Sequence, residues 1–239
     1  MAGTLYCIGV GPGDPELLTL KALKYITSCP VLAVPQAKNG SALTAKEILL
    51  ESLAKTGDIR LEDKTVLTLH FPMTRDEAVL AKAHADGAAA IEAELEQGHD
   101  VALITLGCPT VYATSIYVHR LVQHHGFPTA IIPGVPSFCA VAAKLQRPLC
   151  EKDEPLTIIP GSRKDRKELL QLPGKKVIMK PSGSLQGIQA DLESLGLAPN
   201  AAMIERCGLP SEAVYEHVAD AADTGYFAVI VVGTKEEES

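Results

Sequence analysis

The stretch CIGVGPGDPELLTLKAL, from Cys7 to Leu23, determines how the chain begins to fold. The largely apolar residues 4–10 are typical of a buried strand, and the glycines that end them are typical of a tight turn. Asp14 is a good helix N-cap, and Pro15 suits the first position of a helix. The stretch therefore predicts a strand, a glycine turn and a helix with a broad apolar face that starts at residue 15.

The rest of the chain alternates between strand-like and helix-like segments. Strands are expected at residues 31–35, 65–70, 101–105, 129–132, 156–159, 176–180, 201–205, 213–218 and 226–232, and helices at 41–55, 75–97, 111–125, 164–171 and 184–195. This alternation predicts βαβ units with mostly parallel strands. The last two strands are joined by a short connection, which predicts an antiparallel pair. We therefore expect an α/β fold of two αβα domains, residues 1–130 with a parallel-rich sheet and residues 131–239 with a mixed sheet.

Composition and charge exclude several classes of function. The 239 residues are 46% hydrophobic and carry a formal net charge of −7, whereas a nucleic-acid binder needs clustered Lys and Arg. The apolar runs are too short to span a bilayer, and the first residues lack a signal-peptide pattern. Six scattered cysteines without a CxxC motif predict buried or partly buried free thiols. We expect a cytoplasmic protein without a nucleic-acid, membrane or metal partner.

The first glycine turn differs from a dinucleotide site. The pattern GxGxxG needs a third glycine where this chain has Asp14, and a carboxylate there would repel a pyrophosphate. Pro12 also removes a backbone donor that a phosphate would use. Two interpretations remain open for the turn: it binds a ligand without phosphate, or it is a tight structural corner.

Two more glycine turns follow expected strands. LGCPTVYATSIYV begins at Leu106, after the strand at 101–105, and IIPGVPSF contains the end of the strand at 129–132. Ligands of open α/β sheets bind at the carboxyl ends of the strands. Three turns at one edge of a sheet therefore favour a binding pocket over three unrelated rigid loops.

The ordered motifs of this chain resemble those of the tetrapyrrole methylases. They are GVGPGDPELLTLKA, the LGCP turn with its following tyrosine, IPGVPSF, IERCGLPSE and YFAVIVVG, and they extend over essentially the whole chain. One branch is most similar: FPMTRDEAVLAKAHADGAAAIEAELEQGHDVALITLG, followed by YATSIYVHRL, resembles the precorrin-2 C20-methyltransferases. That branch carries a PMT element, a long helix and a Y-S-T-x-x-Y-like run.

This resemblance implies a homodimer with S-adenosylmethionine (SAM) bound in a cleft between two α/β domains, and S-adenosylhomocysteine (SAH) as product. SAM has no phosphate, which agrees with the first turn. Carried over position by position, the cofactor contacts are Pro12, Cys108, Val111, Ala113, Pro136, Ser137, Met179 and Cys207. Two positions depart from the family: Cys108 replaces an aspartate acceptor, and Ala113 replaces the serine of the Y-S-T run.

The implied reaction is methyl transfer to the C20 meso carbon of precorrin-2 or its cobalt form. That carbon is electron-rich, so no protein nucleophile is needed, but a base would help to remove the C20 proton. Tyr226 is the first candidate for the base and Tyr112 the second, although either phenol could instead orient the ring. The substrate carries many carboxylates, so local cations are expected: Arg206, Lys180 and Arg147. The basic segment GSRKDRKE, residues 161–168, is either a further cationic site or a solvated helix start.

Other functions remain as alternatives. The chain could methylate another ring position, or resemble diphthine synthase in acting on a protein residue. Outside this class, a nucleotide-binding dehydrogenase or a ligand sensor is the alternative, and Asp14 counts against the dehydrogenase.

Overall fold

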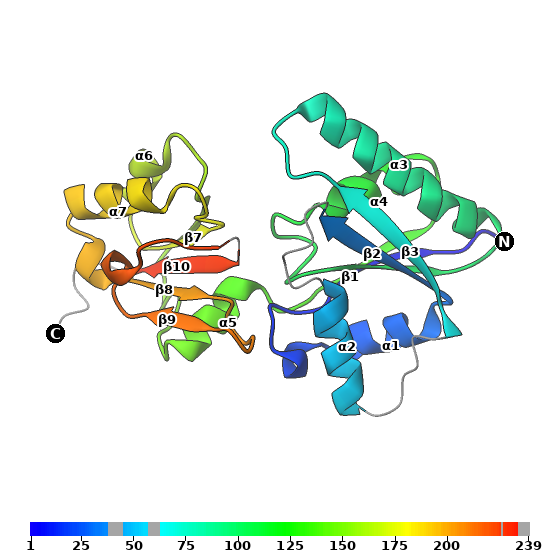
Figure 1. Ribbon diagram of the computed structural model, residues 1–239, viewed down its shortest axis with the longest axis horizontal. Helices are drawn as coiled ribbons and strands as arrows, with labels where there is room; N and C mark the ends of the chain where they lie inside the picture. Colours follow the sequence, from blue (N-terminus) through cyan, green and yellow to red (C-terminus); the bar gives the residue numbers. More distant parts are fainter. Residues whose placement is uncertain (38–44, 57–62, 226, 234–239) are drawn as a thin grey trace. The chain divides into compact units, whose positions relative to one another are not determined.

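The computed structural model describes residues 1–37, 45–56, 63–225 and 227–233 (Figure 1). The chain divides into two compact units, Met1–Pro136 and Ser137–Ser239. Each unit is described by itself below.

The first unit is an open parallel sheet. Its strands are β1 (Leu5–Gly9), β2 (Val31–Ala37), β3 (Thr65–Phe71), β4 (Val101–Thr105) and β5 (Thr129–Ile132), and its helices are α1 (Leu20–Ser28), α2 (Ala45–Thr56), α3 (Glu77–Glu96) and α4 (Ser115–His124). The strand order is β3-β2-β4-β1-β5, and every pairing is parallel. The predicted parallel-rich sheet is confirmed.

Helices cover both faces of this first sheet. Figure 1 shows α3 and α4 on one face and α1 and α2 on the other. All five residues of β4 are buried, as expected for a central strand in a sheet covered on both sides. Against the α3 and α4 face, Leu5, Val101 and Leu103 pack on Ile91 and Val118. This core fixes the strand ends from which the turns emerge.

The second unit is built on a mixed sheet. Its strands are β6 (Leu156–Pro160), β7 (Lys175–Met179), β8 (Ala201–Glu205), β9 (Ala213–Tyr215) and β10 (Ala228–Val232), and its helices are α5 (Ser137–Lys144), α6 (Arg166–Leu170) and α7 (Leu185–Ser194). The order is β6-β7-β10-β8-β9: β6 and β7 are parallel, while the other three pairings are antiparallel. The predicted mixed sheet is confirmed.

The predicted antiparallel pair of the last two strands is wrong. β10 inserts between β7 and β8, and β9 pairs with the opposite side of β8. All five residues of β10 are buried, so this AVIVV segment gains most in the centre of a sheet. β9 has only three residues, and Val214 is exposed, which suits an edge strand.

The first helix also starts later than predicted. Asp14 caps only the short 3₁₀ turn Pro15–Leu17, by accepting a hydrogen bond from the Glu16 amide at 2.9 Å. α1 then begins at Leu20, and the hydroxyl of Thr19 accepts from the Ala22 amide at 3.1 Å. Leu20 is exposed, so the apolar face is narrower than the sequence indicates. The helix α5 was not expected at all.

The cysteine prediction is partly wrong. All six thiols are free, and Cys7, Cys29 and Cys108 are buried. Cys139 and Cys150, however, are exposed.

Candidate cofactor and substrate site

Three glycines bring the turns of the first unit together at the carboxyl edge of its sheet. Gly9 ends β1, Gly107 follows β4 and Gly134 follows β5. A Cβ atom on Gly9 would lie 2.4 Å from the carbonyl oxygen of Gly107 and 2.6 Å from the nitrogen of Gly134. A Cβ on Gly134 would lie 2.2 Å from the same carbonyl oxygen. Only glycine allows three backbones to approach so closely, and the prediction that the turns share one edge is confirmed.

A backbone hydrogen bond adds to this junction. The amide of Gly107 donates to the carbonyl oxygen of Gly11 at 2.8 Å, which ties the second turn to the first. Pro12 is half-buried next to Gly11, and Pro136 is half-buried after the third turn. The structure therefore places Pro12, Cys108 and Pro136 in three turns that leave the same sheet edge.

The second turn carries most of the predicted contacts of the first unit. Cys108 is buried, and its Sγ lies 3.0 Å from the hydroxyl oxygen of Thr110. Ala113 is buried and Val111 is half-buried, whereas Tyr112 is 49% exposed. Tyr112 also has a φ of 47°, in the left-handed region that a tyrosine seldom adopts. This conformation turns the chain sharply before α4 and leaves the phenol accessible.

In the second unit, Lys180 and Arg206 lie at one edge of the sheet. Lys180 directly follows β7, and Arg206 directly follows β8, the two strands on either side of β10. Both residues have left-handed backbones, with φ values of 56° and 53°. Met179 and Cys207 adjoin them in sequence, so the structure brings together four of the predicted residues of this unit at its β7 and β8 ends.

Two glutamates that the sequence analysis missed hold the turn around Arg206. The Glu205 Oε1 accepts a hydrogen bond from the Gly225 amide at 3.0 Å and lies 3.8 Å from Nη2 of Arg206. A Cβ on Gly225 would lie 2.5 Å from that Oε1, so the segment before β10 packs directly on Glu205. Both Glu205 and Glu212 occur in the IERCGLPSE motif, which was the available signal.

Glu212 fastens the other side of the same turn. Its carboxylate lies 2.8 Å from Nζ of Lys144 in α5 and accepts from the Gly208 amide at 2.8 Å. The hydrogen bond from Lys144, followed by that from Gly208, holds the pKa of Glu212 below its ordinary value. The ionised carboxylate of Glu212 therefore holds the backbone next to Cys207 in place.

One of the predicted residues, Arg147, is not brought to this edge. Arg147 pairs with Glu216 at 3.2 Å. Glu216 follows β9, which runs antiparallel to β8, so this pair lies toward the amino end of β8 and Arg206 toward its carboxyl end. Ser137 is half-buried at the start of α5. Tyr226 lies outside the residues that the structure describes.

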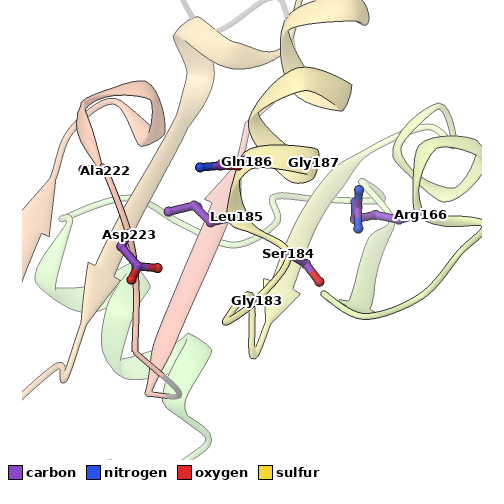
Figure 2. Close-up of a pocket in the computed structure, with 8 residues that line it drawn as sticks. All are labelled: Arg166, Gly183, Ser184, Leu185, Gln186, Gly187, Ala222 and Asp223. Carbon is purple, nitrogen blue, oxygen red and sulfur yellow. The ribbon is translucent and has the colours of Figure 1, made fainter.

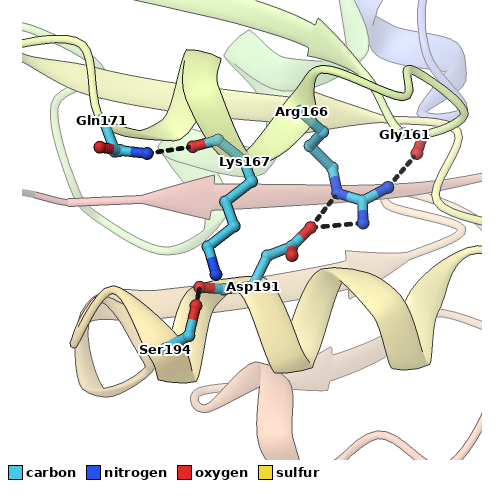
Figure 3. A network of polar contacts seen from close by, with 6 residues as sticks. All are labelled: Gly161, Arg166, Lys167, Gln171, Asp191 and Ser194. Atoms are coloured by element: carbon cyan, nitrogen blue, oxygen red, sulfur yellow. Dashed lines mark hydrogen bonds and ion pairs between the residues drawn. The ribbon is translucent and has the colours of Figure 1, made fainter.

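The basic segment 161–168 is partly internal. Figure 3 shows Arg166 bound to Asp191 of α7 through Nε, at 2.9 Å, and to the carbonyl oxygen of Gly161 through Nη1, at 2.8 Å. The Gly161 amide in turn donates to the carbonyl oxygen of Met179 at 2.7 Å. Arg166 therefore supports the chain beside Met179, while Arg163 pairs with Asp165 at the surface.

A hollow of about 550 Å³ lies at the start of α7. Figure 2 shows its lining: Arg166, Gly183, Ser184, Leu185, Gln186, Gly187, Ala222 and Asp223. Arg166 belongs to the basic segment 161–168, and none of the other predicted site residues lines this hollow.

Two other kinds of feature are absent from the residues that the structure describes. Within the described ranges, no three His, Cys, Asp or Glu side chains are grouped so that they could hold a metal ion. No helix in the described part of the chain is both long and apolar enough to cross a membrane.

The fold and its strand-end turns define an α/β protein whose glycine-rich edge suits a ligand without phosphate. The family model of the Tetrapyrrole (Corrin/Porphyrin) Methylases matches residues 4–223. The chain belongs to this family, as its motifs predicted.

Individual relatives agree with this assignment. The chain is 32% identical over 244 residues to a cobalt-precorrin-2 C(20)-methyltransferase of Salmonella typhimurium, covering 99% of each protein. It is 30% identical over 242 residues to a precorrin-2 C(20)-methyltransferase of Sinorhizobium sp, covering 96% of this chain and 95% of the relative. Its fold is similar to that of uroporphyrin-III C-methyl transferase from Thermus thermophilus complexed with S-adenyl homocysteine, with a TM-score of 0.66 and 22% identity over 97% of each chain.

Proposed function

We propose that this protein transfers the methyl group of SAM to C20 of precorrin-2 or of its cobalt form, in cobalamin biosynthesis. The observation that carries the proposal is the similarity to the Salmonella typhimurium enzyme along 99% of both chains. The similarity to the Sinorhizobium enzyme supports the same reaction on the metal-free ring. A dehydrogenase is disfavoured, because Asp14 stands where a dinucleotide site needs glycine.

The residues of the first unit fit SAM as the cofactor. Gly9, Gly107 and Gly134 form a closely packed junction with no side chains, and we propose that SAM binds beside it, against main-chain atoms of the three turns. The contacts we propose are Pro12, Cys108, Val111, Ala113, Pro136, Ser137, Met179 and Cys207. SAM supplies an electrophilic methyl group on its sulfonium. The Cys108 thiol already faces Thr110 at 3.0 Å, so main-chain groups of this turn would replace the family's aspartate as acceptors.

The chain's own contribution to the reaction is mainly positioning. A displacement at carbon is accelerated when the two reactants are held in line and water is excluded. Tyr112 is accessible at the second turn, and we propose that it orients the ring or accepts the C20 proton. Tyr226 remains the first candidate for this base. A phenol has an ordinary pKa of about 10, so it acts as a base only where a cation lowers that value.

Lys180 and Arg206 are the cations that we propose for the substrate carboxylates. Both follow strands that end at the same sheet edge. Arg147 remains a predicted substrate contact, although its guanidinium pairs with Glu216. We also propose that the enzyme is cytoplasmic and that it is a homodimer. Sedimentation of the purified protein would test the dimer.

The direct test is turnover with methyl-labelled SAM under anaerobic conditions. Metal-free precorrin-2 and cobalt-precorrin-2 are offered side by side, and the product is analysed by mass and by NMR of the labelled carbon. We expect a single new methyl group on C20, and the faster substrate identifies the form of the ring that the enzyme uses. Methylation at another ring carbon, or none on either ring despite SAM binding, would show that the C20 assignment is wrong.

A further inference from the structure

Three rings from three separate elements form a stack in the first unit. The imidazole of His84, on α3, lies parallel to the ring of Tyr117, on α4, with a centroid distance of 4.9 Å and an interplanar angle of 10°. The other neighbour of His84 is Phe71, the last residue of β3, at 5.7 Å and 52°. Phe71 is buried, so the stack is anchored in the core and extends outward to Tyr117.

The outer ring of this stack is open to solvent. Tyr117 is 51% exposed, although its ring has a well-defined neighbour beneath it. Tyr112 and Met73 are also exposed, at 49% and 68%. Met73 follows Phe71 by two positions in the chain, and Tyr112 precedes Tyr117 by five. An exposed aromatic ring that is held in place from beneath offers a ready surface for a flat ligand.

The stack stands on the edge of the sheet that carries the glycine turns. β3 ends at Phe71, and α4 begins shortly after the second turn, so both contribute their parts at the carboxyl edge of the parallel strands. Phe71, which directly precedes the PMT element, and Tyr117, the last residue of YATSIY, thus come together around His84.

The chemistry of the stack suits a flat, unsaturated ring. Burial lowers the pKa of His84, so its imidazole is neutral near pH 7, and its Nε2 has no hydrogen-bond partner among the described residues. Neutral aromatic rings stack on other π-systems through offset or parallel contacts. Arg120 is exposed three residues after Tyr117, one helical turn away, and offers a positive charge beside the ring.

We propose that the exposed face of Tyr117, supported from behind by His84, is a platform on which the tetrapyrrole macrocycle of the substrate stacks. The inference rests on the proposed function and adds a residue that determines how the substrate is bound. We assign the macrocycle rather than the adenine of SAM to this surface, because Phe71 ends the edge strand β3, whereas the glycine junction lies at the ends of β1, β4 and β5, beyond β2. Tyr117 would bind the substrate without taking part in proton transfer.

The test measures substrate binding without turnover. Cobalt-precorrin-2 is titrated into the enzyme in the presence of saturating SAH, and binding is followed by the absorbance of the macrocycle. We expect Tyr117→Ala to weaken this binding by roughly five- to tenfold, the amount that a lost aromatic contact corresponds to. Tyr117→Phe keeps the ring and should bind within about twofold of the wild type. The Kd of SAH itself, measured by calorimetry, should not change in either variant.

Tyr25→Ala is the matched control. Tyr25 stacks on Tyr6 at 4.3 Å, but this pair lies at the start of β1 and the end of α1, the opposite edge of the same sheet. Its removal should leave macrocycle binding unchanged. Equal binding by Tyr117→Ala and the wild type would overturn the platform, as would a parallel loss of SAH affinity in Tyr117→Ala. A wild type that binds SAH but no tetrapyrrole would instead overturn the proposed function, together with this extension of it.

Discussion

At the scale of single residues, the carboxylate of Glu212 offers a measurable effect of pH. Its folded-state pKa is lowered by the hydrogen bonds from Lys144 and Gly208. A lowered pKa means that the ionised form stabilises the fold: the contribution is complete above the ordinary value of 4.5 and is lost as the pH falls through the folded-state pKa. Glu212→Gln should therefore cost about 0.5–1 kcal/mol at pH 7, because Lys144 is half exposed and solvent weakens the pair.

Urea unfolding at pH 7 and at pH 3 measures this difference. The gap between Glu212→Gln and the wild type should shrink toward zero at the lower pH. Glu216→Gln is the control, since Glu216 is 63% exposed in its pair with Arg147 and should have little effect at either pH. A gap that stays constant with pH would show that the charge of Glu212 does not stabilise the turn.

Gly225 provides a second test of the residues around Arg206. An alanine Cβ would lie 2.5 Å from Oε1 of Glu205, so the carboxylate must move and release the Gly225 amide. We expect Gly225→Ala to cost about 0.5–1.5 kcal/mol of unfolding free energy, the typical contribution of an intramolecular hydrogen bond. In a Glu205→Ala background the obstruction is gone, and the same substitution should cost much less. Additive effects in this double-mutant cycle would contradict the contact.

The sequence predicted some site residues better than others, and the reason is physical. Gly9, Gly107 and Gly134 are recognisable because glycines that follow strands are a local signal of a turn, although the close approach of three backbones that requires Gly9 and Gly134 appears only in the fold. Glu205 accepts a hydrogen bond from Gly225, 20 positions later in the chain, and Glu212 pairs with Lys144 of helix α5. No local sequence pattern predicts either contact. The same holds for Arg147, whose pairing with Glu216 became visible only in the folded sheet.

At the scale of elements, the glycine inside α3 limits the stability of that helix. Gly87 is buried in the middle of a 20-residue helix, where glycine is less favourable than alanine by about 0.5–1 kcal/mol. A Cβ there would meet the ring of Phe71 at 3.5 Å, which is ordinary van der Waals contact. Gly87→Ala should therefore stabilise the protein by up to about 1 kcal/mol.

The comparison helix is α7, which contains Gly187. A Cβ at that position would lie 3.3 Å from Nη2 of Arg166, a tighter contact with a side chain that is already bound to Asp191. Gly187→Ala should gain less than Gly87→Ala, or lose stability. The stability change of each variant is measured from the shift of its denaturant midpoint, provided that the m-value is unchanged. Destabilisation by Gly87→Ala would mean that α3 and Phe71 are packed more tightly than the structure shows.

Elements also show where prediction from sequence ends. The periodicity of apolar residues located most strands and helices, because this pattern is present within each short segment of sequence. The order of strands in a sheet cannot be deduced from such short segments. β9 and β10 are consecutive in sequence, yet each pairs with β8 and not with the other. β10 lies between β7 and β8, where both of its faces are buried. The start of α1 was misplaced because Asp14 and Thr19 are both good caps, and the structure uses the first for a 3₁₀ turn only.

At the scale of the whole molecule, cofactor binding should raise the free energy of unfolding. A ligand that binds only the folded state adds RT ln(1 + [L]/Kd), which is about 2.7 kcal/mol at a hundredfold excess over Kd. For a chain of 239 residues this corresponds to a rise in Tm of roughly 5–10 °C. We expect SAH to produce such a rise. NAD at the same concentration should produce none, since Asp14 and Pro12 replace the groups that would hold a pyrophosphate. Stabilisation by NAD without stabilisation by SAH would assign the glycine turns to a dinucleotide and remove the basis for methyl transfer. Equal shifts in wild type and Asp14→Asn would show further that SAH binds without an ionic contact to this carboxylate, which already accepts a hydrogen bond from the Glu16 amide.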